Sequence, residues 1–446
     1  MTHGVTILNP KTIVVWTILT GLLFSACQGP PETSLVTNNP AIPGRCAPTD
    51  VADVAEIIIG ATAPLSEPGA AAAGQVMQTA FSLAVEDINA AGGVLDKPLK
   101  VIVRDTKGLP DQGTQVAGQL ITQDCVVAIV GEYHSAVGLT IMEVAHHYRV
   151  PVIFAETYND DITAAGYPEV FRIAPTSTFT AQMDANWLAD VGDYNGNGMI
   201  SAVVIAENTD YGVGQVDKAK TWFPEFGLTL EVMLVDLPID DFSSVIDQIK
   251  ALEMRPDAIL VKVTGDISYR LQQQIIEAGL APNNQTILVA NQVALNHEAY
   301  WQVVPDGAFV VVPRIGPWGA AITKTGAEFA QRYEGMYDKW PEPYAFEAYD
   351  SVRLIADAIS RAGSLDPDSI ISALETADIE LTSGHYEFPY GRDNPAGGYV
   401  PEFMWHQWPH VPLLFLQYTA PNQHSNDMAV IWPSAYRTTS APVIRP

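Results

Sequence analysis

The sequence predicts an α/β fold with two lobes, each built as a doubly wound parallel sheet. Short apolar runs, each suited to one buried strand, alternate with helical patterns that have an apolar face every 3.6 residues. This alternation occurs in two successive series, separated at residues 171–176 by a stretch without a period. With 446 residues, the chain is also too long for one ordinary core.

The first series starts near residue 56 and predicts one lobe. Its strands are expected at residues 57–63, 99–104, 126–130 and 151–155, and its helices at residues 77–90, at residues 112–122 and in the run that follows Ser135. Gly92 and Gly93 follow the first of these helices as a stop signal. Because the strands are separated by helices that can act as crossovers, we expect them to be parallel.

The second series predicts another lobe of the same kind. Its strands are expected at residues 202–206, 229–234, 258–263 and 286–290, and its helices at residues 181–190, 215–226, 242–252 and 269–278. After residues 310–313, helical patterns follow at residues 325–339, 344–362 and 367–376. These helices come too late to extend the second sheet and lack strands for a third, so we expect them to cover the first lobe.

The chain is therefore expected to cross between the lobes three times. From Gly384 onward it is rich in Pro, Trp and Tyr, with strand-like pieces at residues 403–408 and 413–417 that could complete the second lobe. The predicted domains are a first lobe of residues 51–175 with 314–383, a second lobe of residues 176–313 with 384–432, and a tail of residues 433–446. Two lobes joined in this way form a hinge around a cleft.

The N-terminus has the pattern of an export signal. Lys11 precedes an apolar run at residues 12–24, which ends in the small residues Ser25 and Ala26 and then Cys27. This ending resembles the bacterial lipobox, so residues 1–26 are predicted to be a signal peptide and Cys27 the lipidated first residue. Residues 27–50 are then expected to be a flexible tether. No other run is long and apolar enough to span a bilayer, so the lipid would be the membrane anchor.

Two further cysteines, Cys46 and Cys125, remain in this predicted exported chain. Each precedes an expected strand of the first lobe, so both thiols would lie at the amino end of that sheet if the strands are neighbours. An even number of cysteines in an exported protein favours a structural disulfide. The alternative is two unpaired thiols.

Charge and motifs exclude several classes of function. Acidic residues outnumber basic ones by 51 to 23, and the formal net charge is −28, which argues against nucleic acid or an anionic membrane surface as a partner. The sequence contains no P-loop, no GxSxG elbow and no HExxH helix. His146 and His147 are adjacent on a helix and cannot face one site. We therefore predict no enzyme activity, no cofactor and no metal.

One pattern needs a separate interpretation. Residues 193–198 (DYNGNG) match the start of a calcium loop, with oxygen-bearing side chains at alternate positions and glycine at the sixth. The twelfth position, where a bidentate Glu belongs, is Val204, inside an expected strand. A turn rich in Asn and Gly is the alternative, and the sequence leaves calcium binding open.

Polar loops at the carboxyl ends of the expected strands form the best candidate site. In open parallel sheets ligands bind at this edge. The loops are residues 65–67, 133–135, 156–158, 210–212, 264–266 and 291–292. They carry hydroxyls, carboxylates and aromatic rings but no Lys or Arg, which favours a small zwitterion or a polar neutral molecule. Ser135 opens a helix there, so it can cap that helix or help to bind an anion.

From residue 56 to residue 408 the chain resembles the type I periplasmic binding proteins of the branched-chain amino-acid (Leu/Ile/Val-binding) family, the receptors of ABC importers. The resemblance rests on motifs in a fixed order. They are Ala63–Pro64–Leu65–Ser66 with Gly69 and Gly74, residues 84–89 (AVEDIN) with Gly92–Gly93, Val130–Gly131 with Ser135, residues 150–153 (VPVI), Phe171–Arg172 with Pro175, Tyr211–Gly212 with Gly214, and Tyr344 with Ala348–Tyr349–Asp350.

The resemblance implies roles for individual residues. Ser135 and the helix amides behind it would bind the α-carboxylate of a ligand, and the Ala155 carbonyl and Thr157 hydroxyl would bind its α-ammonium. Tyr211 would close over the ligand from the second lobe. The flanking residues expected to tune selectivity or complete the site are Ser66, Tyr133, His134 and Glu156.

Across the cleft the sequence departs from the family pattern. Asp266 is placed to hold the ammonium from the second lobe, as an acid does in many members that bind amino acids. Where leucine-type receptors have a glutamate after the next strand, this chain has Gln292. Other members of the family bind amides, urea or aromatic acids, so the ligand stays open at this point.

The function that the resemblance implies is binding without chemistry. The protein is expected to be a monomeric, extracytoplasmic, lipid-anchored solute-binding protein that delivers a small amino-acid-like ligand to the transmembrane subunits of an ABC permease. A ligand-sensing module of the same fold without transport is the alternative, and neighbouring permease genes would separate the two. An exported amidase-like enzyme is a weaker third possibility, because the chain shows no activated nucleophile.

Overall fold

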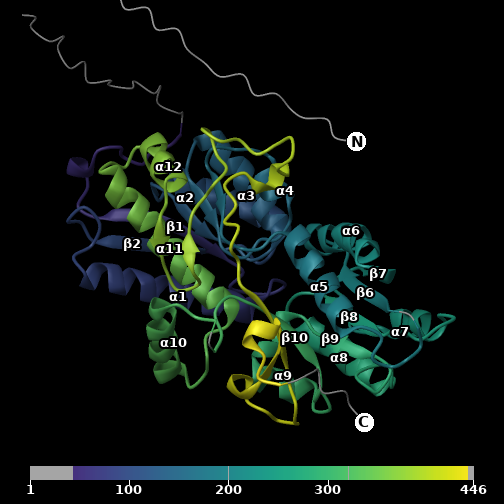
Figure 1. Ribbon diagram of the computed structural model, residues 1–446. Coiled ribbons are helices and arrows are strands. Elements are labelled where there is room, and N and C mark those ends of the chain that lie inside the picture. Colours follow the sequence, from purple (N-terminus) through teal and green to yellow (C-terminus); the bar gives the residue numbers. More distant parts are fainter. Residues whose placement is uncertain (1–43, 199, 320, 440–446) are drawn as a thin grey trace, which may run out of the picture. The chain divides into compact units, whose positions relative to one another are not determined.

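The computed structural model describes residues 44–198, 200–319 and 321–439, which form two sheets with helices around them (Figure 1). The predicted signal peptide, Cys27 and most of the tether lie outside these residues. The first sheet is fully parallel, in the order β2-β1-β3-β4-β5. Its strands are β1 (Ile57–Ala63), β2 (Leu99–Asp105), β3 (Ile129–Gly131), β4 (Val152–Phe154) and β5 (Val170–Arg172).

Helices from two distant parts of the sequence cover the first sheet. The early ones are α1 (Ala71–Ala90), α2 (Pro110–Thr122), α3 (Ser135–Tyr148) and α4 (Asp161–Ala164), and the late ones are α10 (Lys324–Tyr337), α11 (Pro343–Ala362) and α12 (Pro367–Glu375). Helix α1 packs against α11, α2 packs against α3, and α12 packs against α11. The late helices thus complete the first lobe.

The second sheet has seven strands in the order β14-β13-β10-β9-β8-β6-β7. Its strands are β6 (Ser201–Glu207), β7 (Thr229–Val235), β8 (Ala258–Lys262), β9 (Ile287–Val289), β10 (Val311–Ile315), β13 (Leu413–Gln417) and β14 (Ala429–Trp432), and its helices are α5 (Ser177–Val191), α6 (Asp210–Glu225), α7 (Ser243–Lys250), α8 (Ile267–Glu277) and α9 (His297–Val303). Strands β6 to β10 are parallel, whereas β13 and β14 pair antiparallel at one edge. The predicted α/β class with two doubly wound parallel sheets is confirmed.

The third crossing between the lobes comes later than the expected boundary at Gly384. Residues up to Trp408 stay on the first lobe: the small sheet of β11 (Ile379–Glu380) and β12 (His385–Tyr386) lies there, and Gln407 pairs with Arg172 beside β5. The strand predicted at residues 403–408 is absent, because the chain forms the short 3-10 helix η3 (Glu402–Met404) instead. Only β13 and β14, after this segment, join the second sheet.

The buried guanidinium of Arg172 fixes this late segment to the first crossing. It donates to the Gln407 side chain, to the Asn159 carbonyl and to the Thr163 hydroxyl. Gln407 in turn donates to the carbonyls of Ala174 and Trp408. Burial lowers the pKa of Arg172 to about 10, so the guanidinium stays charged at neutral pH. Residues 171–176, expected to be a plain connection, therefore contain the end of strand β5.

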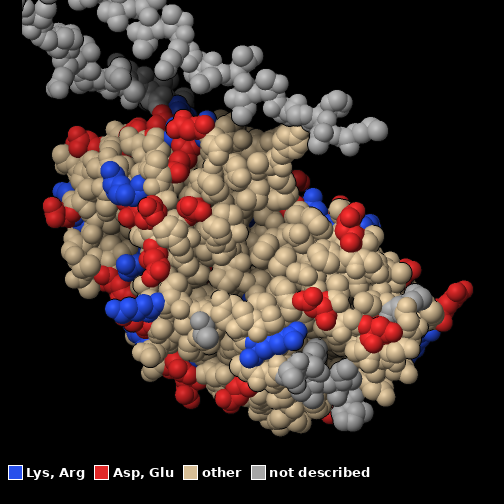
Figure 2. Space-filling view, in the orientation of Figure 1, with Lys and Arg blue, Asp and Glu red and all other residues tan. Residues whose placement is uncertain are grey.

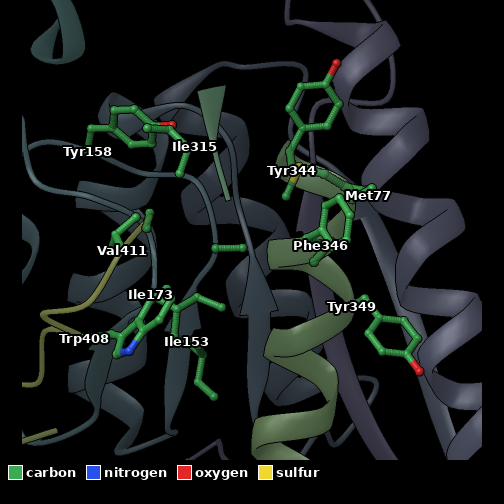
Figure 3. Close-up of a cluster of buried hydrophobic side chains, with 14 of the residues drawn as sticks. Met77, Ile153, Tyr158, Ile173, Ile315, Tyr344, Phe346, Tyr349, Trp408 and Val411 are labelled. Atoms are coloured by element: carbon green, nitrogen blue, oxygen red, sulfur yellow. The ribbon is translucent and has the colours of Figure 1, made fainter. Parts of the chain in front are cut away.

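A hydrophobic cluster runs between the first-lobe sheet, α11 and the late segment (Figure 3). Ile153, Ile173 and Trp408 are buried in it, and α11 carries Tyr344, Phe346 and Tyr349 (Figure 3). Strands such as β8 and β13 are buried along their whole length, which explains why they have continuous apolar runs rather than alternation.

The remaining sequence features have simple structural outcomes. Cys46 and Cys125 form a disulfide, with their Cα atoms 4.9 Å apart. None of the helices in the described ranges combines the length and hydrophobicity that a membrane span needs. On the face drawn in Figure 2, acidic side chains occur in many separate places, and basic ones occur singly or in small groups.

Candidate ligand-binding site

A cavity that is partly open to solvent lies between the two sheets at the carboxyl ends of their strands. The first lobe contributes Tyr133, His134, Ser135, Glu156 and Tyr158. The second lobe contributes Thr180, Asp184, Tyr211, Gln215, Val261, Lys262, Thr264, Ala290, Asn291, Gln292, Pro313, Ile315 and Leu413. Tyr158 and Ile315 also belong to the cluster drawn in Figure 3. Of the predicted site residues, six therefore line one cavity: Tyr133, His134, Ser135, Glu156, Tyr211 and Gln292.

The start of α3 forms one end of this cavity. Gly131 (φ 105°) and Glu132 (φ 65°) turn the chain out of β3 in a conformation that glycine adopts easily, and the helix begins at Ser135. The first N–H groups of a helix have no acceptor within it and attract anions. Since His134 is the cap residue and makes no side-chain capping bond, these amides are available to a ligand carboxylate.

Ser135 does not act as a helix cap. Its Oγ accepts the backbone N–H groups of Tyr158 and Asn159, at 3.1 and 3.2 Å. The hydroxyl thereby ties α3 to the loop after β4, and its own proton remains to be donated. Ser135 thus connects two of the strand-end loops and lines the cavity at the same time.

The buried carboxyl of Glu132 stabilises the loop before α3 by hydrogen bonds. Its Oε1 accepts the backbone N–H of His134 at 3.1 Å and faces the Thr106 hydroxyl at 3.4 Å. Burial raises the pKa of Glu132 to about 7. Burial also lowers the pKa of His134 to about 4, so its imidazole is neutral and its Nε2 accepts the Ala70 N–H at 3.2 Å.

The loop after β4 presents different residues than expected. Glu156 and Tyr158 line the cavity, whereas Ala155 and Thr157 are fully buried and outside the lining. The cause is the two-residue alternation of extended chain: Thr157 points to α3, where a Cβ added at Gly138 would lie 2.7 Å from its methyl group. Neither residue is therefore in the cavity lining, and the ammonium contacts expected from the Ala155 carbonyl and the Thr157 hydroxyl stay a prediction.

Two other expected residues lie outside the lining. The Ser66 hydroxyl donates to Asp105 at 2.5 Å and holds its own loop. Asp266 precedes α8 without a side-chain capping bond, and burial raises its pKa. The neighbouring Gly265 comes close to Ala70 of the first lobe, so Asp266 lies near a contact between the lobes rather than in the cavity wall.

The second lobe contributes an ion pair that the strand-end loops did not predict. Lys262, the last residue of β8, binds Asp184 of α5 at 2.6 Å, and both are buried. Burial raises the pKa of Asp184 although the lysine opposes this. The expectation of a site without Lys or Arg is thus corrected. A lysine within an apolar strand run is the sequence signal that could have revealed it, because such a charge needs a buried partner.

Helices also contribute lining residues that loop positions could not reveal. Thr180 of α5 donates to the Gln215 side chain of α6 at 2.9 Å, and Gln215 donates to Ser177 at 3.2 Å. Tyr211, at the start of α6, has its ring 6.0 Å from that of Tyr158 across the cavity. The second wall is therefore already hydrogen-bonded within itself.

Gln292 connects the two lobes directly. Its amide donates to Oε1 of Glu156, and it lies 3.2 Å from the Tyr158 hydroxyl, which itself donates to Glu156 at 2.9 Å. A second direct link is the bond from the Asn159 amide to the Asp210 carbonyl at 2.8 Å. The lobes thus touch through polar groups at the cavity edge.

In the loop at residues 193–198, which resembles the start of a calcium loop, the side chains form hydrogen bonds within the protein. Asp193 accepts the N–H groups of Asn197 and Gly198, and the Asn195 and Asn197 amides donate to Asp257. This is a turn held by side-chain caps. Within the described residues there is no cluster of three or more His, Cys, Asp or Glu suited to a metal.

Residues 56–397 match the family described as "Periplasmic binding protein". The chain belongs to the periplasmic binding protein family. The resemblance stated from the motifs is confirmed, and so is the prediction of a binding protein rather than an enzyme.

Individual family members share about a quarter of their residues with this chain. It is 25% identical over 351 residues to an amino acid binding protein of Pseudomonas aeruginosa, covering 78% of this chain and 90% of that protein. It is 26% identical over 351 residues to the Leu/Ile/Val-binding protein homolog 7 of Brucella abortus, covering 76% and 86%.

Solved structures of periplasmic binding proteins show the same fold. The leucine binding protein LivK of Thermotoga maritima has a TM-score of 0.70 at 20% identity, covering 87% of this chain and 99% of that chain. LivJ of Streptococcus pneumoniae, solved in complex with isoleucine, has a TM-score of 0.70 at 21% identity, covering 85% and 100%.

Proposed function

We propose that this periplasmic binding protein captures a small amino-acid-like ligand between its two lobes and delivers it to an ABC importer. The observation that carries the proposal is the start of α3 at Ser135, which opens into a cavity lined by both lobes. Helix amides and a serine hydroxyl suit a carboxylate. The relatives named for amino acids support the same ligand class.

Closure of the lobes is the means of capture. A ligand that contacts the α3 start and the second wall together binds only when both are near, and it shifts the population to the closed form. Gln292, Asn159 and the ion pair between Lys218 and Asp160, at 3.2 Å, link the lobes in this structure. No bond in the ligand is broken, so binding and release are the whole activity.

The proposal includes a location outside the cytoplasm and a lipid anchor at Cys27. The apolar run followed by Ser25, Ala26 and Cys27 supports both. The importer would recognise the closed lobes while the tether keeps the protein at the membrane. Replacing Cys27 with Ala and assaying the membrane fraction of cells tests the anchor, since the variant should leave the membrane fraction.

A ligand screen tests the binding function. Mature protein should be unfolded and refolded to remove any carried-over ligand, and its thermal unfolding then compared with amino acids, amides and small carboxylates. A ligand at 100 times its Kd stabilises by about 2.7 kcal/mol, which raises Tm measurably. Calorimetry on the hits should give one site per chain. The absence of stabilisation by every compound would overturn the proposal.

A further inference from the structure

Two buried carboxyl groups, Glu156 and Glu347, lie next to each other at one side of the cavity, and we call this pair and the neighbouring Gln292 amide the cavity floor. Glu156 follows β4 and lines the cavity, and Glu347 lies on α11 behind it; they are 4% and 2% exposed. Their carboxyl groups lie close enough to interact, and burial raises the pKa of both. One shared proton can join two such groups, as it does in other carboxyl dyads.

The floor holds more acceptors than donors. Glu156 Oε1 is satisfied by Gln292 and by the Tyr158 hydroxyl. Four further acceptor atoms have no hydrogen-bond donor among the described residues: Glu156 Oε2, both carboxyl oxygens of Glu347 and Oε1 of Gln292. A shared proton would satisfy one oxygen of each Glu, and the other acceptors would stay unpaired. Buried acceptors without donors are destabilising.

The cations nearby are already engaged. Arg314 is buried and donates to the carbonyls of Pro317 and Pro341, at 3.0 and 2.9 Å, and it packs over the Trp318 ring. Lys262 is held by Asp184. In the part of the chain that the structure describes, no Lys or Arg forms an ion pair with Glu156 or Glu347. The missing donors must therefore come from outside the protein.

We propose that the floor is a cation subsite, and that the ligand carries a second nitrogen cation, an amine or a guanidinium, which binds at Glu156 and Glu347. Its N–H groups supply the donors that the floor lacks. The rings of Tyr133 and Tyr158, which line the same cavity, add a favourable environment for a cation. The proposal rests on the proposed function and narrows its ligand class from amino-acid-like compounds to basic ones.

Matched ligand pairs test the subsite. Calorimetry on refolded protein should compare lysine with norleucine and arginine with citrulline, because each pair differs mainly in the distal cation. We expect the basic member of each pair to bind at least tenfold more tightly than the neutral one. Equal or tighter binding of the neutral member would overturn the proposal.

Two variants test which carboxyl group causes the preference for a basic ligand. Glu347→Gln should reduce the preference for the basic ligand over the neutral one at least tenfold. Glu342→Gln is the matched control: this carboxyl is also buried near the start of α11, but it is already paired with Lys339 at 2.8 Å, so the preference should persist. Unchanged preference in Glu347→Gln would overturn the role of Glu347.

The outcome also separates this proposal from the proposed function. If neutral amino acids bind and basic ones do not, the capture function stands and the cation subsite fails. If no amino-acid-like compound binds, the capture function itself fails. The ranking of ligands by the unmodified protein decides the matter even if Glu347→Gln does not fold.

Discussion

The two walls of the cavity handle charge in opposite ways. On the first lobe, the α3 start offers free helix amides, and the carboxyl groups of Glu156 and Glu347 form no ion pair among the described residues, although the charge of the buried Arg314 acts on Glu347. On the second lobe, Lys262 and Asp184 neutralise each other, and Thr180 and Gln215 bind each other. The first wall thus has several unsatisfied polar groups for a ligand, whereas the polar side chains that line the second wall are paired except for Oε1 of Gln292, as far as the described residues show.

This difference assigns discrimination between ligands to the first wall and movement during closure to the second. Groups without protein partners discriminate between ligands, because a ligand that fails to supply the missing partner leaves them buried and unpaired. A wall that is satisfied internally can approach or leave without a large electrostatic cost. We infer that ligand identity is determined mainly on the first lobe, and that the second lobe contributes shape and a few polar links such as Gln292.

The largest expected effect comes from breaking the second wall. Lys262→Met leaves Asp184, which is 2% exposed, as a buried charge without a partner, and should lower the free energy of unfolding by about 3–5 kcal/mol. Urea denaturation measures it. Adding Asp184→Leu should restore most of the loss, since the unpaired charge is then gone. An unchanged urea midpoint for Lys262→Met would contradict a stabilising ion pair between Lys262 and Asp184.

The next largest effect is a pH dependence of the free energy of unfolding, which comes from Glu132 beneath the first wall. Glu132 has its pKa raised by burial from 4.5 to about 7, so the folded protein binds this proton more tightly than the unfolded chain. The resulting stability is fully present below pH 4.5 and is lost as the pH rises to about 7, by at most about 1.4 kcal/mol per pH unit.

Glu132→Gln isolates this contribution from the other carboxyls. The glutamine keeps the acceptor for the His134 amide but has no proton to lose, so the difference in unfolding free energy between the two proteins should change over that pH window and be constant outside it. Urea titrations at a series of pH values measure it. Parallel stability curves would show that Glu132 titrates normally.

A smaller effect is expected at the start of α3. Ser135→Ala removes a hydroxyl partner of the ligand carboxylate and should weaken binding by about 1–3 kcal/mol. It also frees the Tyr158 and Asn159 amides, so stability should fall as well. Calorimetry on protein confirmed to be folded separates the two. Thr140→Ala, which removes a hydroxyl of the same helix that bonds to the Pro110 carbonyl and lies outside the cavity lining, serves as control and should keep ligand affinity.

The smallest effect belongs to the link between the walls. Gln292→Leu removes the hydrogen bonds to Glu156 and Tyr158, which should weaken ligand binding by about 0.5–1.5 kcal/mol. The lobes themselves should unfold at nearly the same urea concentration, since the bond joins lobes rather than stabilising either. A loss of more than a hundredfold in affinity would place recognition on the second wall instead.

Most of the fold could be predicted from local pattern. Strands β1 and β13 were expected at the residues where they occur, because short continuous apolar runs suit strands that are buried on both faces. Strands β5 and β14 were not expected. Their pairing partners lie on other elements, and four or fewer residues carry too little period to be recognised.

The site was predicted less completely than the fold. Loop positions at strand ends indicated Tyr133, His134 and Ser135, which line the cavity. In the loop after β4, the expected Glu156 lines the cavity but the expected Thr157 does not. Which side chains of an extended segment face a cavity depends on how the neighbouring elements pack. Asp184 and Glu347 lie on helices, and nothing in the local sequence tells which strand-end loop a helix residue will reach.

By itself, the sequence determined the class of fold, the two series of strands and helices, and the strand edge that lines the cavity. Apolar periodicity and short connections are local properties, so they can be read along the chain. The tertiary structure alone decided the partners of the buried charges. It paired Lys262 with Asp184, 78 positions apart, and left Glu156 and Glu347 facing each other. Burial turns such juxtapositions into large energies, and burial is a property of the folded molecule.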